Sequence, residues 1–205
     1  MVGTVPARMG HMTDLPFPTL INSTPPETAE VSVRPAREAD AQSIGRVMLA
    51  SWRASYPEAL QDVLAELTVD EVADQWRESI TSPPSGRHLI LVALEASEIV
   101  GYLLAAPLEK GDDVAPGATI TDVSDLVIHP EHTRRGHGSR LLAAAVDRMR
   151  DHGATEAATW SVEGDVDRLS FLESAGFGDD GSRRQLDMGP GSLALIQRRF
   201  TALLR

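Results

Sequence analysis

The sequence predicts an α/β domain with three layers, in which helices cover both faces of a central sheet. Strand-like apolar runs and amphipathic helical patterns follow one another in the order β-α-α-β-β-β-α-β-α, then a short β hairpin and a last helix. At the centre, residues 122–152 predict a strand, a glycine-rich turn and a helix in direct succession. The chain has 205 residues, 42% of them hydrophobic, which is enough for one domain with a full core.

The chain divides into three predicted parts. Residues 1–29 contain five prolines and no periodicity, so we expect a disordered N-terminal tail. Residues 30–189 form the predicted domain, and residues 190–205 form a predicted C-terminal amphipathic helix. The apolar residues of that helix fall on one face: Leu193, Ile196, Phe200, Leu203 and Leu204. We expect this face to cover the domain's own surface, and a homodimer contact is the alternative.

The elements of the domain follow from periodicity, turn residues and capping residues. Predicted strands cover residues 31–34, 88–94, 99–106, 118–128 and 155–162, and a short hairpin around Asp180-Gly181 covers 177–188. Predicted helices cover residues 41–56, 69–82, 139–152 and 166–175. Thr68 and Glu71 have the spacing of a capping box, and Asp165 is suited to cap the helix that follows it.

The central stretch is the most informative part of the sequence. Leu126, Val127 and Ile128 predict a buried strand, which Pro130 must end because proline cannot donate to a sheet ladder. Gly136 and Gly138 then allow the backbone to bend tightly or to approach a ligand. An apolar helix face follows, formed by Leu141, Leu142, Ala145, Val146 and Met149.

This strand, turn and helix favour an anion site, because free backbone N–H groups and the positive end of the helix point to one place. Arg134 and Arg135 add positive charge there, so the expected ligand is a phosphate or pyrophosphate. The alternative is that the glycines serve only the geometry of the turn. His129, His132 and His137 also cluster on the turn, but the histidines lack metal-ligand spacing, so we expect no metal.

Composition excludes several classes of function. The chain has no cysteine, so disulfides, thiol nucleophiles and cysteine-ligated metals are excluded. The net charge of −11 argues against general nucleic-acid binding and is compatible with a cationic partner or with solubility alone. No apolar run approaches the roughly 20 residues of a membrane span, and the first residues lack a secretory signal pattern. We therefore expect a cytoplasmic protein without a membrane partner.

Two motifs in this order resemble the GNAT superfamily of acyl-CoA-dependent N-acyltransferases. Residues 126–138, LVIHPEHTRRGHG, are similar to the family's hydrophobic-Val-x-Pro strand end and its Gln/Arg-x-x-Gly-x-Gly/Ala pyrophosphate loop, although Thr133 departs from the usual Gln or Arg. Residues 165–177, DVDRLSFLESAGF, resemble the family's Asn-x-x-Ala-x-x-Phe-Tyr-Glu-x-x-Gly-Phe. Residues 34–40 are similar to its usual opening, and the resemblance covers about residues 31–188.

The resemblance implies a mixed, mostly antiparallel sheet that holds acetyl-CoA across a splayed pair of strands. The backbone of residues 126–128 is expected to pair with the pantetheine arm, and the N–H groups of residues 134–139 to hold the pyrophosphate. The implied cofactor-binding residues are Leu126, Val127, Ile128, Arg134, Arg135, Gly136, His137, Gly138, Ser139, Asp165 and Phe171. The acceptor amine is expected from the opposite side, near the first two helices.

Transfer of an acyl group to an amine needs a neutral amine, a stabilised oxyanion and a proton for the thiolate. Asp122 lies four residues before Leu126, where many family members carry a Glu, and is the candidate catalytic base. Asp125 points to the other face in an ideal strand, unless a bulge intervenes. The family often uses a Tyr as acid, but that position is Leu172 here. Water or one of three residues must substitute: Tyr56, Tyr102 or Ser161.

Three functions therefore compete. The first is an N-acetyltransferase that acts on an amine of a small molecule or peptide. The second is a non-catalytic acyl-CoA-binding or regulatory module, which Leu172 favours. The third is a dinucleotide-binding oxidoreductase, which lacks the third glycine of its motif because Leu141 stands there. Acidic residues in the loops 53–67 and 107–118 favour a cationic acceptor: Glu58, Asp62, Glu66, Asp112 and Asp113.

Overall fold

A computed structural model describes residues 30–55, 61–108, 119–186 and 195–204 of the chain. The predicted N-terminal tail therefore lies outside the described residues. The same holds for Tyr56, Glu58, Asp112 and Asp113, and for the side chain of Asp62. Within the described part of the chain, the elements follow the predicted order up to residue 176.

The described strands form one seven-stranded sheet in the order β1-β2-β3-β4-β5-β7-β6. Neighbouring strands are antiparallel except for β4 and β5, which are parallel. The strands are β1 (Val31–Pro35), β2 (Leu89–Glu95), β3 (Glu98–Pro107), β4 (Ile120–Ile128), β5 (Glu156–Val162), β6 (Gly178–Leu186) and β7 (Leu195–Leu203). The fold is therefore a mixed, mostly antiparallel sheet, as expected.

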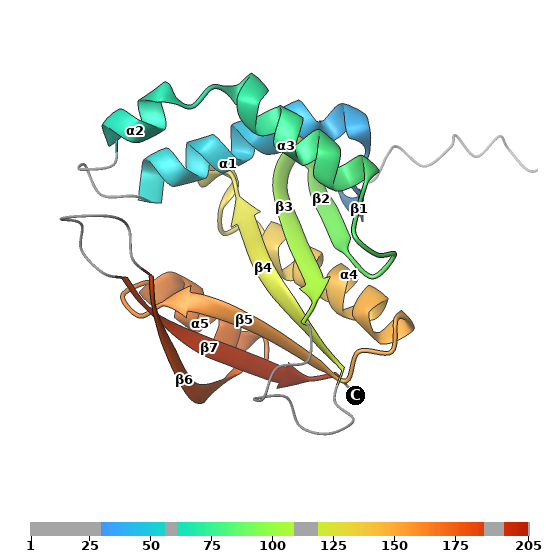
Figure 1. The fold of residues 1–205 in the computed structure, drawn as a ribbon, viewed down its shortest axis with the longest axis vertical. Helices are drawn as coiled ribbons and strands as arrows, with labels where there is room; N and C mark the ends of the chain where they lie inside the picture. Colours follow the sequence, from blue (N-terminus) through green and yellow to red (C-terminus); the bar gives the residue numbers. More distant parts are fainter. Residues whose placement is uncertain (1–29, 56–60, 109–118, 187–194, 205) are drawn as a thin grey trace, which may run out of the picture.

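Helices cover both faces of the sheet, which makes three layers (Figure 1). Helices α1 (Ala41–Ser55) and α3 (Val69–Thr81) pack on one face, and α4 (His137–Asp151) and α5 (Val166–Ser174) pack on the other. The short helices are α2 (Gln61–Glu66), η1 (Glu38–Asp40) and η3 (Pro130–His132). None of the helices in the described part of the chain is long and apolar enough to cross a membrane.

Predicted capping residues begin two of these helices. Thr68 accepts from the Glu71 N–H at 3.3 Å, and the Glu71 carboxylate accepts from the Thr68 N–H at 3.0 Å, which is a complete capping box. Asp165 accepts from the Arg168 N–H at 3.0 Å and caps α5. The local chemistry of both helix starts was therefore predictable from the sequence.

Two apolar cores lie on opposite faces of the sheet. The larger packs α4 and α5 on the sheet and includes Leu141, Met149 and Phe200, each at most 1% exposed. The smaller packs α1 and α3 on the sheet and includes Ile44 and Tyr102, both fully buried. Truncation of such a buried Leu or Met to Ala typically costs about 2–5 kcal/mol, so both cores contribute strongly to stability.

The predicted C-terminal helix is wrong, because residues 195–203 form strand β7. β7 pairs with β5 along one edge and with β6 along the other, which satisfies its backbone groups on both sides. Phe200 enters the core, whereas Ile196 and Leu203 remain 47% and 67% exposed. The helical spacing of the apolar residues was accidental, and pairing with two distant strands decided the conformation.

The hairpin predicted around Asp180-Gly181 is also wrong. Residues 178–186 form the single strand β6, and its register with β7 shifts between Asp179 and Arg183. Asp179 accepts from the Gly181 N–H, Asp180 accepts from the Ser182 N–H, and Gly181 has φ of 89°. The turn chemistry is real, but it produces a bulge within a strand, and the hairpin is formed by β6 and β7.

Candidate active site

Within the described part of the chain, the turn between β4 and α4 leaves a run of backbone N–H groups free. Arg134 and Gly136 have φ of 62° and 81°, so the chain turns through left-handed backbone before α4 begins. The backbone N–H groups of residues 134–139 have no hydrogen-bond acceptor among the described residues. A run of free donors at a helix N-terminus is suited to a pyrophosphate. The turn that the sequence predicted therefore has the geometry expected for it, and its role as a cofactor site stays a proposal.

The turn lies close to Leu126 and Phe171, two of the predicted cofactor-binding residues. A Cβ atom on Gly138 would lie 3.5 Å from the Leu126 side chain and 3.7 Å from the Phe171 ring. The end of β4, the start of α4 and the middle of α5 therefore meet at this glycine.

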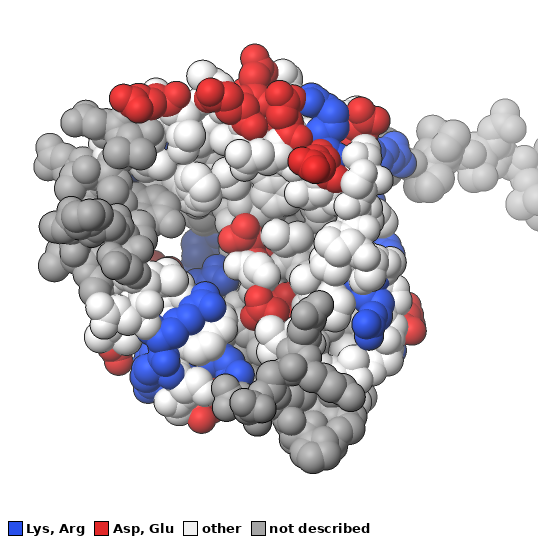
Figure 2. All heavy atoms as spheres, viewed as in Figure 1, with Lys and Arg blue, Asp and Glu red and all other residues white. Residues whose placement is uncertain are grey.

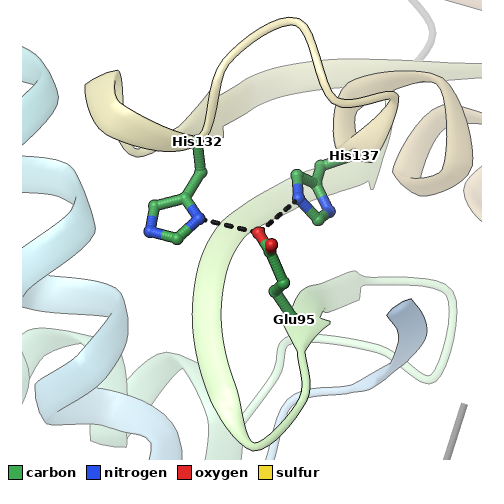
Figure 3. A group of neighbouring side chains, drawn as sticks. All are labelled: Glu95, His132 and His137. Carbon is green, nitrogen blue, oxygen red and sulfur yellow. Dashed lines mark hydrogen bonds and ion pairs between the residues drawn. The ribbon is translucent and has the colours of Figure 1, made fainter. Parts of the chain in front are cut away.

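A carboxylate outside the predicted site fastens the turn to the β2–β3 hairpin. Glu95 accepts from His132 Nδ1 at 2.8 Å and from His137 Nε2 at 3.2 Å (Figure 3). It also accepts from Arg135 Nη1 at 3.0 Å. Hydrogen bonds from His132 and His137 and the charge of Arg135 lower the pKa of Glu95 to about 2. Sequence reasoning missed Glu95 because it lies 37–42 residues from its partners.

The side-chain atoms of Glu95, His132 and His137 that could ligate a metal ion all lie within 4.8 Å of one another, so we considered a metal site. Two features of the cluster disagree with a metal site. Arg135 already supplies a positive charge to the same carboxylate. The buried Nδ1 atom of His137 has no partner among the described residues, whereas ligating histidines usually donate through their second nitrogen. The cluster fits a structural fastening of the turn better than a metal centre.

Towards its C-terminal end, which leads into the turn, β4 separates from β5. The two strands pair only from Ile120 to Asp122, so the rest of β4 has no strand partner on that side among the described residues. Two side chains cross the gap: Thr159 Oγ1 donates to the Val123 carbonyl at 2.8 Å, and Arg168 Nη1 donates to the Leu126 carbonyl at 3.1 Å. Arg168 stands at the position that is Ala in the family motif, a departure that places a guanidinium beside the splayed strand.

A bulge in β4 brings two carboxylates to one face of the sheet. The register with β3 shifts so that Leu104 faces Asp125 and Ala105 faces Val123, which leaves Ser124 as the extra residue. Val123 and Leu126 then both pack in the core under α4, so Asp122 and Asp125 share the opposite face. The bulge that the sequence analysis allowed for is therefore present, and Asp125 does not point away from Asp122 as it would in an ideal strand.

Both carboxylates on β4 lie in a poorly solvated environment. Burial raises the pKa of Asp122, against a hydrogen bond that Ser124 Oγ donates at 2.8 Å and the charges of Arg184 and Arg199. Burial also raises the pKa of Asp125, where Arg168 opposes the shift and Asp122 adds to it. Carboxyl groups with raised pKa values on the open face of a sheet are suited to accept a proton or to bind an amine.

The candidates for the proton donor are placed less favourably. Leu172, where the family often has Tyr, is 3% exposed in the core under α4. Tyr102 is fully buried in the core under α1 and α3, and its ring centre lies 4.8 Å from that of Trp76. The Ser161 hydroxyl is buried on β5, beyond the paired segment, without a hydrogen-bond partner among the described residues. Of these side chains, Ser161 alone combines an unpaired hydroxyl with the splayed strand.

The splayed strands of the sheet and the donor-rich turn are consistent with a family match of the sequence. The acetyltransferase (GNAT) family model matches residues 45–177. The chain belongs to the GNAT acetyltransferase family. The resemblance inferred from the two motifs is thus confirmed, and so is the three-layer α/β fold.

Relatives and solved structures show how far this similarity extends. The chain is 34% identical over 145 residues to a mycothiol acetyltransferase from Streptomyces coelicolor, which is 64% of this chain and 42% of that protein. The chain thus spans less than half the length of this curated relative. A ribosomal-protein-alanine N-acetyltransferase from Brucella melitensis superposes with a TM-score of 0.66 at 17% identity, over 84% of this chain and 99% of that one.

A further solved structure with the same fold contains a bound ligand. The PaiA N-acetyltransferase from Thermoplasma acidophilum, solved with coenzyme A, superposes with a TM-score of 0.57 at 19% identity. The match covers 82% of this chain and 97% of that chain. At these identities the solved structures support the fold alone.

Proposed function

We propose that the chain is an N-acetyltransferase that transfers an acetyl group from acetyl-CoA to an amine by direct attack. The observation that carries this proposal is the pair of desolvated carboxylates, Asp122 and Asp125, on the strand that leads into the donor-rich turn. Acid–base groups and an anion site thus belong to one continuous segment, residues 122–139. This is the arrangement that acyl transfer from a pyrophosphate-containing thioester requires.

The donor is expected to lie along the splayed part of β4. The N–H groups of residues 134–139 hold the pyrophosphate, and the backbone of residues 126–128, which has no strand partner on the β5 side among the described residues, pairs with the pantetheine arm. Glu95 keeps the turn in place through His132, Arg135 and His137. Asp165 contributes to this site by capping α5, and Phe171 by packing against the turn.

The acceptor amine is expected on the open face of β4. Its nitrogen attacks the thioester carbonyl carbon, a C–N bond forms, and Asp122 takes the proton of the amine, directly or through water. The C–S bond then breaks, and the thiolate takes a proton from water or from Ser161. The balanced products are an amide and free coenzyme A.

The similarity to a mycothiol acetyltransferase favours a small-molecule acceptor over a protein. A second function remains, a non-catalytic module that binds acyl-CoA, and the core position of Leu172 favours it because the family's usual acid is missing. Turnover of any amine eliminates this second function. The oxidoreductase alternative is abandoned, because the family of the chain is that of acetyltransferases.

The test begins with thermal shifts in acetyl-CoA, coenzyme A and NADH. A ligand at a hundredfold excess over Kd stabilises the folded state by about 2.7 kcal/mol, so a rise with acetyl-CoA and none with NADH is expected. Thiol release with a panel of amines follows, and the chain contributes no thiol background because it has no cysteine. The absence of any shift with acetyl-CoA would contradict the proposed function.

A further inference from the structure

The open face beside β4 carries basic as well as acidic side chains. Figure 2 shows acidic groups over β4 and basic groups over β6 and β7 on the same face of the molecule. In a chain with a net charge of −11, this basic region is a local exception. We propose that the acceptor is an amine that also carries an anionic group, with the amine at Asp122 and Asp125 and the anion at Arg184. This inference rests on the proposed function and specifies its substrate class.

The register of the strands places these residues on one face. Asp122 is paired with Ala158, so Trp160, two residues further along β5, faces the same side as Asp122. Trp160 is paired with Arg199 on β7, and two residues earlier Gln197 is paired with Arg184 on β6. The open face therefore runs from the carboxylates of β4 across an indole ring to two arginines.

Arg184 is held in place without a negative partner. Its Nε donates to Gln197 Oε1 at 2.7 Å, and its guanidinium carbon lies 4.3 Å from the centre of the Trp160 ring. No carboxylate of the described residues lies within 4.0 Å of its guanidinium nitrogens. Arg199, in contrast, is paired with Asp180. Arg184 is thus an oriented cation whose forked terminal nitrogens suit a carboxylate or a phosphate.

The acidic side chains of β4 and Arg184 on β6 are separated but interact electrostatically. Burial raises the pKa of Asp122, and the charge of Arg184 opposes this rise although no ion pair joins the two side chains. An acceptor with opposite charges at its two ends would bridge this separation, and the Trp160 ring between them would contact its apolar body. A simple cationic amine would use only the acidic end and would be repelled by Arg184.

The experiment compares kcat/KM for acceptors in matched sets. Each amino acid is tested with its carboxamide and its decarboxylated amine, and each aminoalkyl phosphate with its amino alcohol. We expect the member that carries the anionic group to exceed the members that lack it by at least about tenfold, and the two kinds of set distinguish a carboxylate from a phosphate. Arg184→Gln should remove this preference by raising KM for the members that carry the anionic group.

Arg183→Gln is the matched control, because Arg183 is the neighbouring residue on the opposite face, where it pairs with Asp179. That variant should keep the preference. Equal or better turnover of the members that lack the anionic group, or a preference that survives Arg184→Gln, would overturn the inference and leave the proposed function standing. A protein that binds acetyl-CoA but acetylates no member of any set would overturn the proposed function itself, and this inference with it.

Discussion

Glu95 and Asp122 are both carboxylates at the candidate site, but their surroundings give them opposite properties. Glu95 accepts hydrogen bonds from two imidazoles and one guanidinium, which lower its pKa to about 2. Asp122 accepts one hydrogen bond from Ser124, and burial raises its pKa. Glu95 therefore remains an anion under all ordinary conditions, whereas Asp122 is poised to exchange a proton.

The two carboxylates differ in what they can do: one holds the turn in place, and the other can take up a proton. A carboxylate saturated with donors cannot act as a base, because protonation would break the contacts that hold it. A desolvated carboxylate on an open face gains by taking a proton or by pairing with a cation. Under the proposed function, Glu95 therefore supports the donor-rich turn, and Asp122 takes part in the reaction. The following predictions test this division, from the largest expected effect to the smallest.

Asp122→Asn should abolish most of the activity, because it removes the proposed base without changing the shape of the side chain. We expect kcat to fall by at least about 100-fold, the scale of general-base catalysis, while the thermal shift with acetyl-CoA stays as in the wild type. Thiol release and thermal shift measure the two properties separately. Asp151→Asn, on the exposed end of α4, serves as control and should change neither. Wild-type kcat in the Asp122→Asn variant would remove Asp122 from the mechanism.

Glu95→Gln should have the reverse effect. Loss of the charge that holds Arg135 loosens the turn, so the Kd for acetyl-CoA should rise by about tenfold, which corresponds to one charge-assisted hydrogen bond. At saturating acetyl-CoA, kcat should remain near the wild-type value. Calorimetry and initial rates provide both numbers. Glu98→Gln, on the exposed end of the same hairpin, is the control. A fall in kcat with unchanged affinity would contradict the division of roles.

Acid unfolding should show the contribution of Glu95 to stability. Its pKa is lower in the folded protein than the ordinary value of 4.5, so the unfolded chain takes up the proton more readily as the pH falls. The stabilisation is complete above about pH 4.5 and is lost as the pH approaches about 2. Denaturant titrations of the wild type and of Glu95→Gln should therefore differ at pH 6 and converge towards pH 2. A constant difference across this range would argue against the lowered pKa.

Ser124→Ala should produce the smallest effect, a shift of the pH profile. The Ser124 hydroxyl lowers the pKa of Asp122, so its removal should move the acidic limb of kcat to higher pH. A hydrogen bond of about 1 kcal/mol corresponds to roughly 0.7 pH unit. An aromatic amine of low basicity is the suitable acceptor, because its own protonation does not mask the limb. An unchanged profile would mean that another group controls it.

The comparison also shows where prediction from the sequence succeeded. The strand end at Pro130, the glycine-rich turn, the capping residues and the start of α4 all follow from residues within a few positions of one another. Backbone sterics, proline chemistry and capping are local, so they are visible in a single sequence. The anion site was predictable for the same reason, since it consists of successive backbone groups at one helix start.

The failures share the opposite cause. Residues 195–203, within the helix predicted for 190–205, form a strand because β5 and β6 lie on either side of them. Asp125 shares a face with Asp122 because β4 bulges at Ser124 against β3. Neither the partner strands nor the register shift can be seen in the local pattern, since the apolar spacing of either segment is compatible with two conformations.

The sequence by itself therefore determined the fold class, the family motifs and the donor-rich turn, because each depends on the chemistry of neighbouring residues. Only the tertiary structure decided which charges meet. It brought Glu95 to three partners at least 37 residues away, and it placed Arg184 and Asp122 on one face of the sheet. Side chains from distant segments acquire their pKa values and their roles through solvation and contacts, and these exist only once the sheet has formed.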